Sequence, residues 1–427
     1  MITACALPLS AQSADVFHLP SEEINQRLPR WLRFSGEERL RLEGFDAGGF
    51  KPDNGDAYLL HRFRFNMNIQ PAGWLKVFVQ TQDARVFWKN QVPAAPFQDT
   101  WDLRLAYAEA GDMEKSPVAL RIGRQEIKLG EERLVGDAWW GNTPRSFDAA
   151  RLAFHYHKVR LDAFASSLVV VQDGQVGSVQ PGNNLHGLYG GLTNVIPNST
   201  IEPYLLWRLQ PGVQSELDGI GHLDMKVSGV RWVGTLPHHF DYRTEVAFER
   251  GRVLQDHIQA WAGHWVAGYT FSTAAWKPRL LAEYNYATGD GNSKDGRRNT
   301  FDQLYPSAHD MYGLADQVGW KNIHHVRSGV EWKVTPRWSM GSRYSDYWLA
   351  NAHDALYNTA SAVVARSANG SAGRWVGQEI DFLTLYQPFK TTQIGAGLAH
   401  IFPGTFLKLT TPGRGYTAPY LFFNSEF

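Results

Sequence analysis

Arginines at every second position are the feature of this sequence with the clearest chemical potential. Arg39 and Arg41 alternate with leucines, and further along the chain Arg62 and Arg64 alternate with phenylalanines. Successive side chains of a β-strand point to opposite faces, so each pair of arginines shares one face of a strand. A guanidinium group binds a carboxylate through two parallel N–H donors, so such a face is suited to anionic groups.

The same alternation recurs along the chain and defines a set of candidate residues on one polar face. The set contains arginines in the polar phase of successive strands and a few carboxylates in the same phase. Its members are Arg39, Arg41, Arg62, Arg64, Arg104, Arg121, Arg151, Arg160, Arg243, Arg327, Arg343, Glu37, Asp102 and Asp162. A ladder of arginines would offer a polyanion successive weak sites, which conduction needs more than one tight site. Alternatively, these arginines and carboxylates neutralise one another as ion pairs and have a structural role only.

Short alternating segments follow one another from residue 31 to the C-terminus. We count about 18 of them, most of them near the length that crosses a hydrocarbon core at a tilt. On the segment from Trp101 to Tyr107 we expect Leu103, Leu105 and Tyr107 on the apolar face and Arg104 on the polar one. The sequence therefore predicts an all-β protein.

The connections between these segments alternate between long and short. Short ones include residues 71–73, 157–158 and 335–336, and the long ones fall at about 44–56, 86–99, 127–146, 169–184, 209–223, 289–320, 348–376 and 403–415. The connection at 251–256 is the one short member of the long series. This alternation on an even number of strands is typical of a transmembrane antiparallel β-barrel of the bacterial outer membrane, with long extracellular loops and short periplasmic turns. A secreted β-sandwich also has alternating strands, but its connections are not sorted by length in this way.

The composition excludes several other classes of protein. Lys and Arg together number 42, as do Asp and Glu, so the chain lacks the net positive charge of a nucleic-acid-binding protein. A single cysteine among 427 residues excludes a disulfide framework. No apolar stretch of about 18 residues is present, so no transmembrane helix is predicted.

The two ends of the chain carry their own signals. Residues 1–14 resemble the tail of a signal peptide, with small and apolar residues and a small-x-small site at 11–13 but no charged segment in front. We therefore expect a truncated signal peptide remnant at 1–14, a periplasmic tail or a single helical turn at 15–30, and the barrel at 31–427. The chain stops at Phe427 in an aromatic strand, the kind of end that the barrel assembly machinery of the outer membrane reads.

The segment between two of the expected strands resembles the alginate export family of outer-membrane porins. The residues that carry the resemblance are Gly123–Gln125, Gly130–Gly136, Trp140, Asn142, Arg145, Phe147–Asp148 and Arg151, followed by Glu283–Gly291, Thr300–His309, Tyr312–Gly313 and Asp316. The resemblance covers about residues 31–427. It implies a monomeric barrel in outer-membrane lipid and lipopolysaccharide, with an arginine-rich interior that passes an anionic polysaccharide such as alginate.

Other candidate sites have weaker support. Asp290, Asn292 and Asp295 could offer oxygen ligands to Ca²⁺, but the intervening lysine favours a solvated turn, so no metal site and no cofactor are predicted. Adjacent histidines such as His324 and His325 lack metal-ligand spacing and are expected at a surface or interface.

Two functional classes remain open at this stage. No nucleophile elbow, phosphate loop or zinc-protease motif is present, so the leading hypothesis is a passive channel and not an enzyme. The alternative is an outer-membrane barrel that acts as an adhesin or enzyme through its long extracellular loops.

Overall fold

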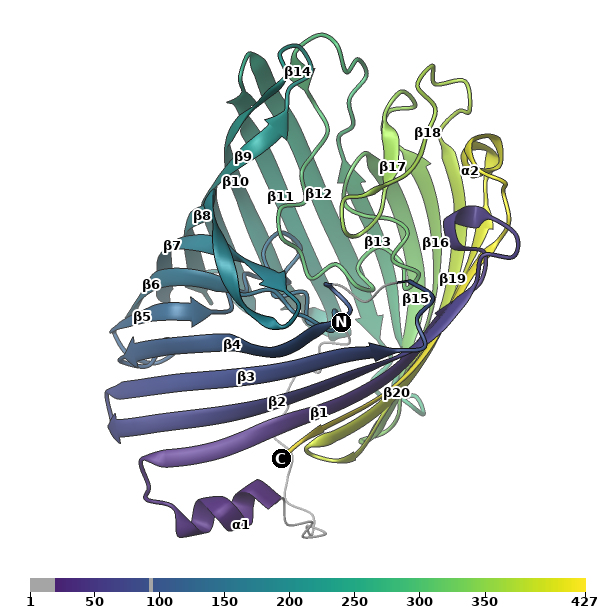
Figure 1. Ribbon diagram of the computed structural model, residues 1–427. Helices are drawn as coiled ribbons and strands as arrows, with labels where there is room; N and C mark the ends of the chain where they lie inside the picture. The colour runs from purple at the N-terminus through teal and green to yellow at the C-terminus, as the bar shows by residue number, and fades with distance from the viewer. Residues whose placement is uncertain (1–19, 92–94) are drawn as a thin grey trace.

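The chain folds into one closed antiparallel β-barrel, which a computed structural model describes for residues 20–91 and 95–427 (Figure 1). The main sheet contains 19 strands, and one of these, the two-residue β14, pairs with β12 as a short parallel addition. The other eighteen follow one another around the ring in chain order. The first strand, β1, pairs with the last, β21, so the sheet has no free edge. The predicted number of strands is confirmed.

The eighteen strands of the wall differ in length. In order, they are β1 Leu32–Phe45, β2 Asp56–Ala72, β3 Leu75–Phe87, β4 Asp99–Ala110, β5 Val118–Gln125, β6 Phe147–Tyr156, β7 Val159–Gln172, β8 Gln175–Thr193, β9 Ser199–Gln214, β10 Ile220–Leu236, β11 Phe240–Val253, β12 Asp256–Thr270, β13 Arg279–Ala287, β15 Ile323–Thr335, β16 Trp338–Leu349, β19 Trp375–Phe389, β20 Thr392–Pro403 and β21 Tyr416–Glu426.

The remaining elements are short and lie outside the wall. They are the helices α1 Pro20–Arg27 and α2 Thr405–Thr410, the 3-10 turns η1 Gly48–Phe50 and η2 Pro237–His239, and the strands β14 Arg297–Arg298, β17 Ala355–Tyr357 and β18 Val363–Arg366. Among the described residues, no helix is long and apolar enough to cross a membrane. The expected segment 1–14 lies outside the described residues. The expected tail at 15–30 includes α1, which is longer than a single turn.

Alternation gives the wall an apolar outer face and a polar inner face. On β5 and β6, the outward residues Ile122 and Phe154 are 53% and 44% exposed, whereas the inward Arg151 is 8% exposed. Large exposed hydrophobic side chains of this kind recur around the whole ring. At the seam, the backbone of Phe427 exchanges two hydrogen bonds with Gly36, and its ring stacks on Phe63.

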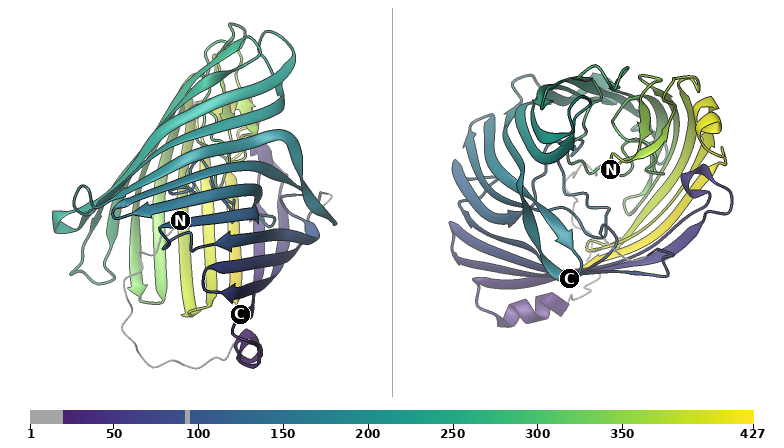
Figure 2. Two further views of the ribbon diagram at one scale, coloured as in Figure 1. Left: turned by 90° about the vertical axis from the view of Figure 1, so that its left-hand side faces the viewer. Right: turned by 45° about the horizontal axis from the view of Figure 1, so that its top comes forward.

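Two connections that the sequence analysis expects to be long are tight turns. Residues 173–174 join β7 to β8, and residues 215–219 join β9 to β10, because strand pairing continues through the positions assigned to loops. The β7–β8 hairpin therefore outreaches β5 and β6, which have 8 and 10 residues. Its tip leans across them to β4, where Asp173 accepts a 2.9 Å hydrogen bond from the backbone of Thr100 (Figure 2).

The predicted assignment of side chains to the two faces of β4 is wrong from Leu105 onward. Leu103 and Leu105 pair with two consecutive residues of β3, so Arg104 is an extra residue in the ladder, which is a β-bulge. The bulge moves Leu105 and Tyr107 from the outer to the inner face, so Leu105 is only 6% exposed. Arg104 itself stays inside, and the Arg121 guanidinium lies 4.5 Å from the centre of the Tyr107 ring.

Two long loops fold into the barrel and form most of its core. Residues 126–146 and residues 288–322 meet through backbone hydrogen bonds, among them Gly136 N–H to Tyr305 O at 2.8 Å and Ser307 N–H to Glu132 O at 2.9 Å. Aromatic side chains of the second loop, such as Tyr312 and Trp320, are completely buried. The space enclosed by the wall, called the lumen below, is therefore partly occupied by these loops.

Candidate functional site inside the barrel

The loop of residues 126–146 crosses the lumen. At one end, the carbonyl groups of Trp139 and Gly141 accept hydrogen bonds from arginines of β1 and β2. At the other end, Glu131 lies 3.3 Å from both Arg231 of β10 and Arg243 of β11. Since β1 and β10 lie on opposite sides of the eighteen-strand ring, the loop spans the interior, as the right-hand view of Figure 2 shows.

Five of the predicted residues gather where this loop meets the wall. We call Arg39, Arg41, Arg62, Arg64 and Arg104 the arginine cluster. Arg39 and Arg62 are direct partners in the β1–β2 ladder, and all five side chains are at most 9% exposed. Such dense burial of one sign of charge is costly unless each group has polar partners.

Backbone carbonyl groups of the loop are the main partners of Arg39. Its two terminal nitrogens each donate a 3.0 Å hydrogen bond, to the carbonyl oxygens of Trp139 and Gly141. Arg62 donates to the same two carbonyls, and Arg41 donates to Trp140, whose ring also lies 4.0 Å from the Arg41 guanidinium. The loop carbonyls therefore hold guanidinium groups where carboxylates are too few.

Carboxylates offset only part of this charge. Glu37 bonds Arg62 at 2.5 Å and Arg64 at 3.2 Å, while Glu43 pairs with Arg41 at 2.6 Å. Arg104 pairs with Glu126 and lies 3.9 Å from Asp137, and Lys128 pairs with both of these acids. Within the described chain, Arg39 forms no ion pair. Among Arg39 and the groups that these ion pairs join, six cations thus stand against four carboxylates, which is an excess of two positive charges.

The predicted residues on β4 to β7 are compensated instead. Arg121 lies 2.5 Å from Glu109, and Asp162 accepts from both Arg151 and Arg160. Arg160 also pairs with Glu114, so three arginines face three carboxylates. Asp102 is 5% exposed and accepts a hydrogen bond from the backbone of Gly177 in the leaning hairpin. These arginines and carboxylates therefore neutralise one another as ion pairs, which is the structural alternative given in the sequence analysis.

A small cavity lies on the other side of the crossing loop. Its volume is about 170 Å³, and arginines and acids alternate along its wall: Glu131, Glu132, Arg133, Arg231, Arg243, Glu283, Asp310, Arg327, Glu331 and Arg343. Burial raises the pKa of Glu131, but Arg133, Arg243 and Arg231 outweigh this effect and hold the pKa at about 2. The predicted Arg327 and Arg343 are anchored by Glu283 and Asp310. Five arginines face five acids, so this cavity is balanced in charge.

Several residues of the site were not predicted from the sequence. The carbonyl groups of residues 139–141 leave no side-chain signal, and Asp310 and Glu131 lie in segments without periodicity. His325 was expected at a surface but is completely buried, where Asn285 and Ser345 contact its two ring nitrogens. Its strand phase could have placed it inside, because it precedes the inward Arg327 by two positions.

A wider cavity of about 550 Å³ opens beyond the two loops, toward the ends of β9 to β12. Glu216 and Asp290 lie together there, and burial with the Asp290 carboxyl raises the pKa of Glu216 to about 7. The candidate metal ligands Asp290, Asn292 and Asp295 do not converge. Asp290 and Asp295 each accept a hydrogen bond from a backbone N–H two residues ahead, and Asp290 is buried, whereas the sequence analysis expects a solvated turn. In the described part of the chain, no three acidic, histidine or cysteine side chains form a metal-binding group.

Comparison with solved structures supports the same architecture. The fold resembles the outer membrane protein opdK from Pseudomonas aeruginosa, with a TM-score of 0.61, 9% identity, and 92% and 98% of the two chains covered. It also resembles Acinetobacter baumannii OccAB2, with a TM-score of 0.60, 12% identity and coverage of 92% and 98%. For Pseudomonas aeruginosa OpdQ the TM-score is 0.59 at 11% identity, with coverage of 93% and 97%. Identities this low establish the fold alone.

The sequence comparison identifies the family. No curated protein matches the chain. The family model described as alginate export, however, matches residues 30–420, which is most of the 427 residues. The match to this family, the closed barrel and its apolar outer face indicate a channel protein of the bacterial outer membrane. The chain belongs to the alginate export family.

Proposed function

We propose that this channel passes anionic saccharides, with a uronate polymer such as alginate as the cargo that the family suggests. The observation that carries the proposal is the arginine cluster, which together with its ion-paired partners has an excess of two positive charges where the crossing loop narrows the lumen. Arginine keeps its charge at any physiological pH, so this field is permanent. A carboxylate on each sugar would meet it at regular intervals.

The partners of the cluster explain how binding can be weak and reversible. Arg39 and Arg62 now donate to neutral carbonyl groups of residues 139–141. A carboxylate forms hydrogen bonds with a guanidinium about twice as strong as those of a neutral acceptor. A passing uronate can therefore replace these carbonyls for a time and release them again. The neutral ladder of Arg121, Arg151 and Arg160 adds polar contacts without holding the cargo tightly.

Single-channel recording in planar bilayers tests the proposal. We expect oligouronates to interrupt the current of the parent protein at concentrations at which neutral oligosaccharides of the same length do not. The variant Arg39→Gln/Arg62→Gln should lose most of this block, while Arg39→Lys/Arg62→Lys should retain part of it because the charge remains. Equal block by charged and neutral sugars in the parent protein would refute an anionic cargo.

The alternative of an adhesin or enzyme requires loops that present a surface to the outside. The loop at 288–322 instead buries aromatic side chains such as Phe301 and Trp320 inside the barrel, and its His309 stacks on Trp140 of the loop at 126–146. This arrangement favours a channel. Liposome swelling by small saccharides separates the two cases, because an adhesin or enzyme barrel need not conduct. The proposed channel is monomeric, needs no cofactor and is assembled through recognition of Phe427.

A further inference from the structure

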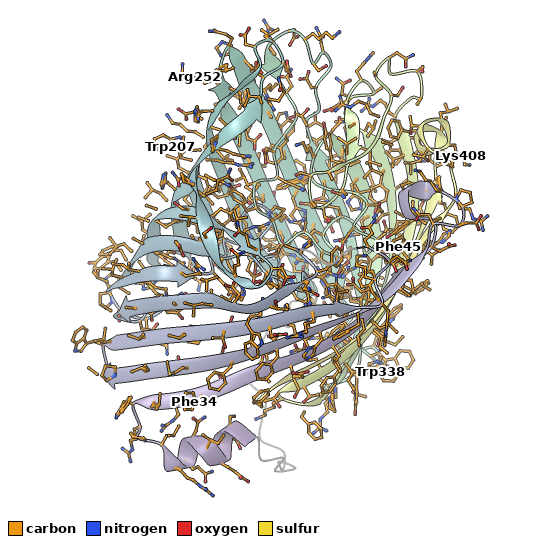
Figure 3. All side chains as sticks on the ribbon, viewed as in Figure 1. Phe34, Phe45, Trp207, Arg252, Trp338 and Lys408 are labelled. Carbon is orange, nitrogen blue, oxygen red and sulfur yellow. The ribbon has the colours of Figure 1, made fainter. Side chains whose placement is uncertain are left out.

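The outer face of β10 to β12 carries a cluster of cations near the long-loop end of the wall. Lys226 of β10 is the direct partner of Arg250 of β11. One step further along, Arg252 is the partner of His257 on β12, which in turn neighbours Arg297 of β14. All five side chains are exposed. Figure 3 shows Arg252 on the outer edge of the wall, on the same side as Trp207.

A row of aromatic residues lies one step below these cations. Phe248 and Trp261 are partners across β11 and β12, with ring centres 6.4 Å apart, and they are 45% and 37% exposed. Toward the short-turn end, the outward positions continue with residues such as Trp265 and Val246. Aromatic rings mark the border between hydrocarbon and head groups in outer-membrane barrels. The cations therefore lie at the level of the outer-leaflet head groups.

Local acids offset only part of the charge of this cluster. Asp224, the partner of Arg252, accepts a 2.8 Å hydrogen bond from the indole N–H of Trp207. Arg250 donates to the carbonyl oxygens of Glu249 and Ala260, which carry no charge. Among the described residues, Arg252 forms no ion pair. Exposed cations that lack an anion of the protein itself are suited to an external one.

An apolar groove adjoins the same place on the outer face. Its volume is about 450 Å³, and the exposed residues Leu120, Leu152, Leu188, Leu205 and Trp207 line it. The groove exists because Ala163 stands between Leu152 and Leu188, and because two small residues, Ala150 and Ala165, are partners in the next cross-strand row. Trp207 ends the groove and is the strand partner of Lys226, whose ammonium lies 5.8 Å from the Trp207 ring.

We propose that this surface binds the lipid A part of lipopolysaccharide. The ligand must have phosphate groups at the membrane surface and acyl chains directly beneath them. A phosphate on Lys226, Arg250 and Arg252 would place an attached acyl chain beside Trp207, at the open end of the groove. The charge of the cluster and its continuity with the groove favour this occupant over a second copy of the chain. A second copy would present the same cations and repel them.

The test uses the full-length protein refolded in detergent without lipopolysaccharide. Lipopolysaccharide with a short core is then added, and native mass spectrometry measures the bound fraction. The variant Lys226→Gln/Arg250→Gln/Arg252→Gln should bind at least about tenfold more weakly, because each cation near an anionic lipid surface contributes to attraction. The matched control Lys333→Gln/Arg337→Gln/Lys390→Gln removes three exposed cations near the short-turn end and should bind like the parent.

Further binding measurements test which part of the ligand is recognised and whether the groove takes part. Lipid A without phosphate should lose most of its binding to the parent, and inorganic phosphate alone should not compete. Ala165→Phe fills the groove and should weaken binding while conductance and the heat-dependent shift in electrophoretic mobility stay unchanged. Equal binding by the parent and the first triple variant, or equal binding of phosphatidylglycerol and lipopolysaccharide, would overturn the proposal. Dimers that form without lipopolysaccharide and disappear in Ala165→Phe would assign the groove to a second copy instead.

Discussion

Removal of four guanidinium groups should reverse the ion preference of the channel. The arginine cluster and its ion-paired partners comprise six cations and four carboxylates. Changing Arg39, Arg41, Arg62 and Arg64 to Gln leaves two cations against the same four acids. The local charge therefore changes from +2 to −2. Glu37→Gln acts in the opposite direction and raises the charge to +3.

The size of the effect follows from Coulomb's law. A charge of +2 at a distance of about 10 Å in water changes the energy of a monovalent ion by about 0.8 kcal/mol before screening. At 0.01 M salt, where the screening length is about 30 Å, about 0.6 kcal/mol remains. Anions gain this energy and cations lose it, so the parent should prefer anions by about sevenfold. At physiological salt, the preference should fall to about twofold.

Reversal potentials under a salt gradient in planar bilayers measure this ratio. The quadruple variant should prefer cations by a similar factor, and Glu37→Gln should prefer anions more strongly than the parent. The heat-dependent shift in electrophoretic mobility confirms that each variant forms a folded barrel. Lys226→Gln, on the outer face of β10, is the control for charge outside the lumen. Reversal potentials that are the same in the parent and both variants would show that the cluster does not face the ion path.

Four other results are expected. Glu216→Gln should raise the melting temperature at pH 8 but not at pH 4. Because the pKa of Glu216 is raised to about 7 in the folded state, the wild-type protein loses stability as pH rises through that value and the carboxyl ionises, whereas glutamine stays neutral. Asn142→Ala, which removes the hydrogen bonds of a buried side chain to three backbone carbonyl groups, should cost about 1–3 kcal/mol of unfolding free energy in urea titrations. A tag near Ser293 should be labelled on intact cells and a tag at Pro237 should not, and the reverse pattern would invert the topology. Deletion of Phe427 should lower the amount of folded barrel in the outer membrane, and an unchanged amount would make this residue incidental.

Alternation along the strands made most of the fold predictable. Each strand has one face in lipid and one in the lumen, so residues such as Arg39 and Leu40 report their orientation locally. The errors arose where local rules fail. The bulge at Arg104 exchanges the two faces of β4 without any change in composition. Residues 169–184 were predicted to be a long loop, but strand pairing continues on both sides of the turn at residues 173–174.

The candidate site was less predictable than the wall. The polar phase identified the arginines, but their partners come from loops that have no period. The contacts of Arg39 with residues 139–141 join positions about a hundred apart in the chain and depend on backbone carbonyls, which every residue has. Charge balance also depends on such pairs. Arg121 and Arg39 look alike in the sequence, yet one has a carboxylate partner and the other does not.

The unequal lengths of the strands have a consequence for the membrane around the protein. With a rise of about 3.3 Å per residue and a tilt of about 40°, the 8 residues of β5 span only about 20 Å of membrane thickness. The apolar band of an outer-membrane barrel is about 25 Å tall. The 17 residues of β10 exceed it with a span of about 43 Å. This hydrophobic mismatch means that the bilayer must thin, or the barrel must tilt, beside β5 and β6. The outward ion pair of Arg124 and Asp148 at the end of these two strands is then level with the head groups and not with the acyl chains.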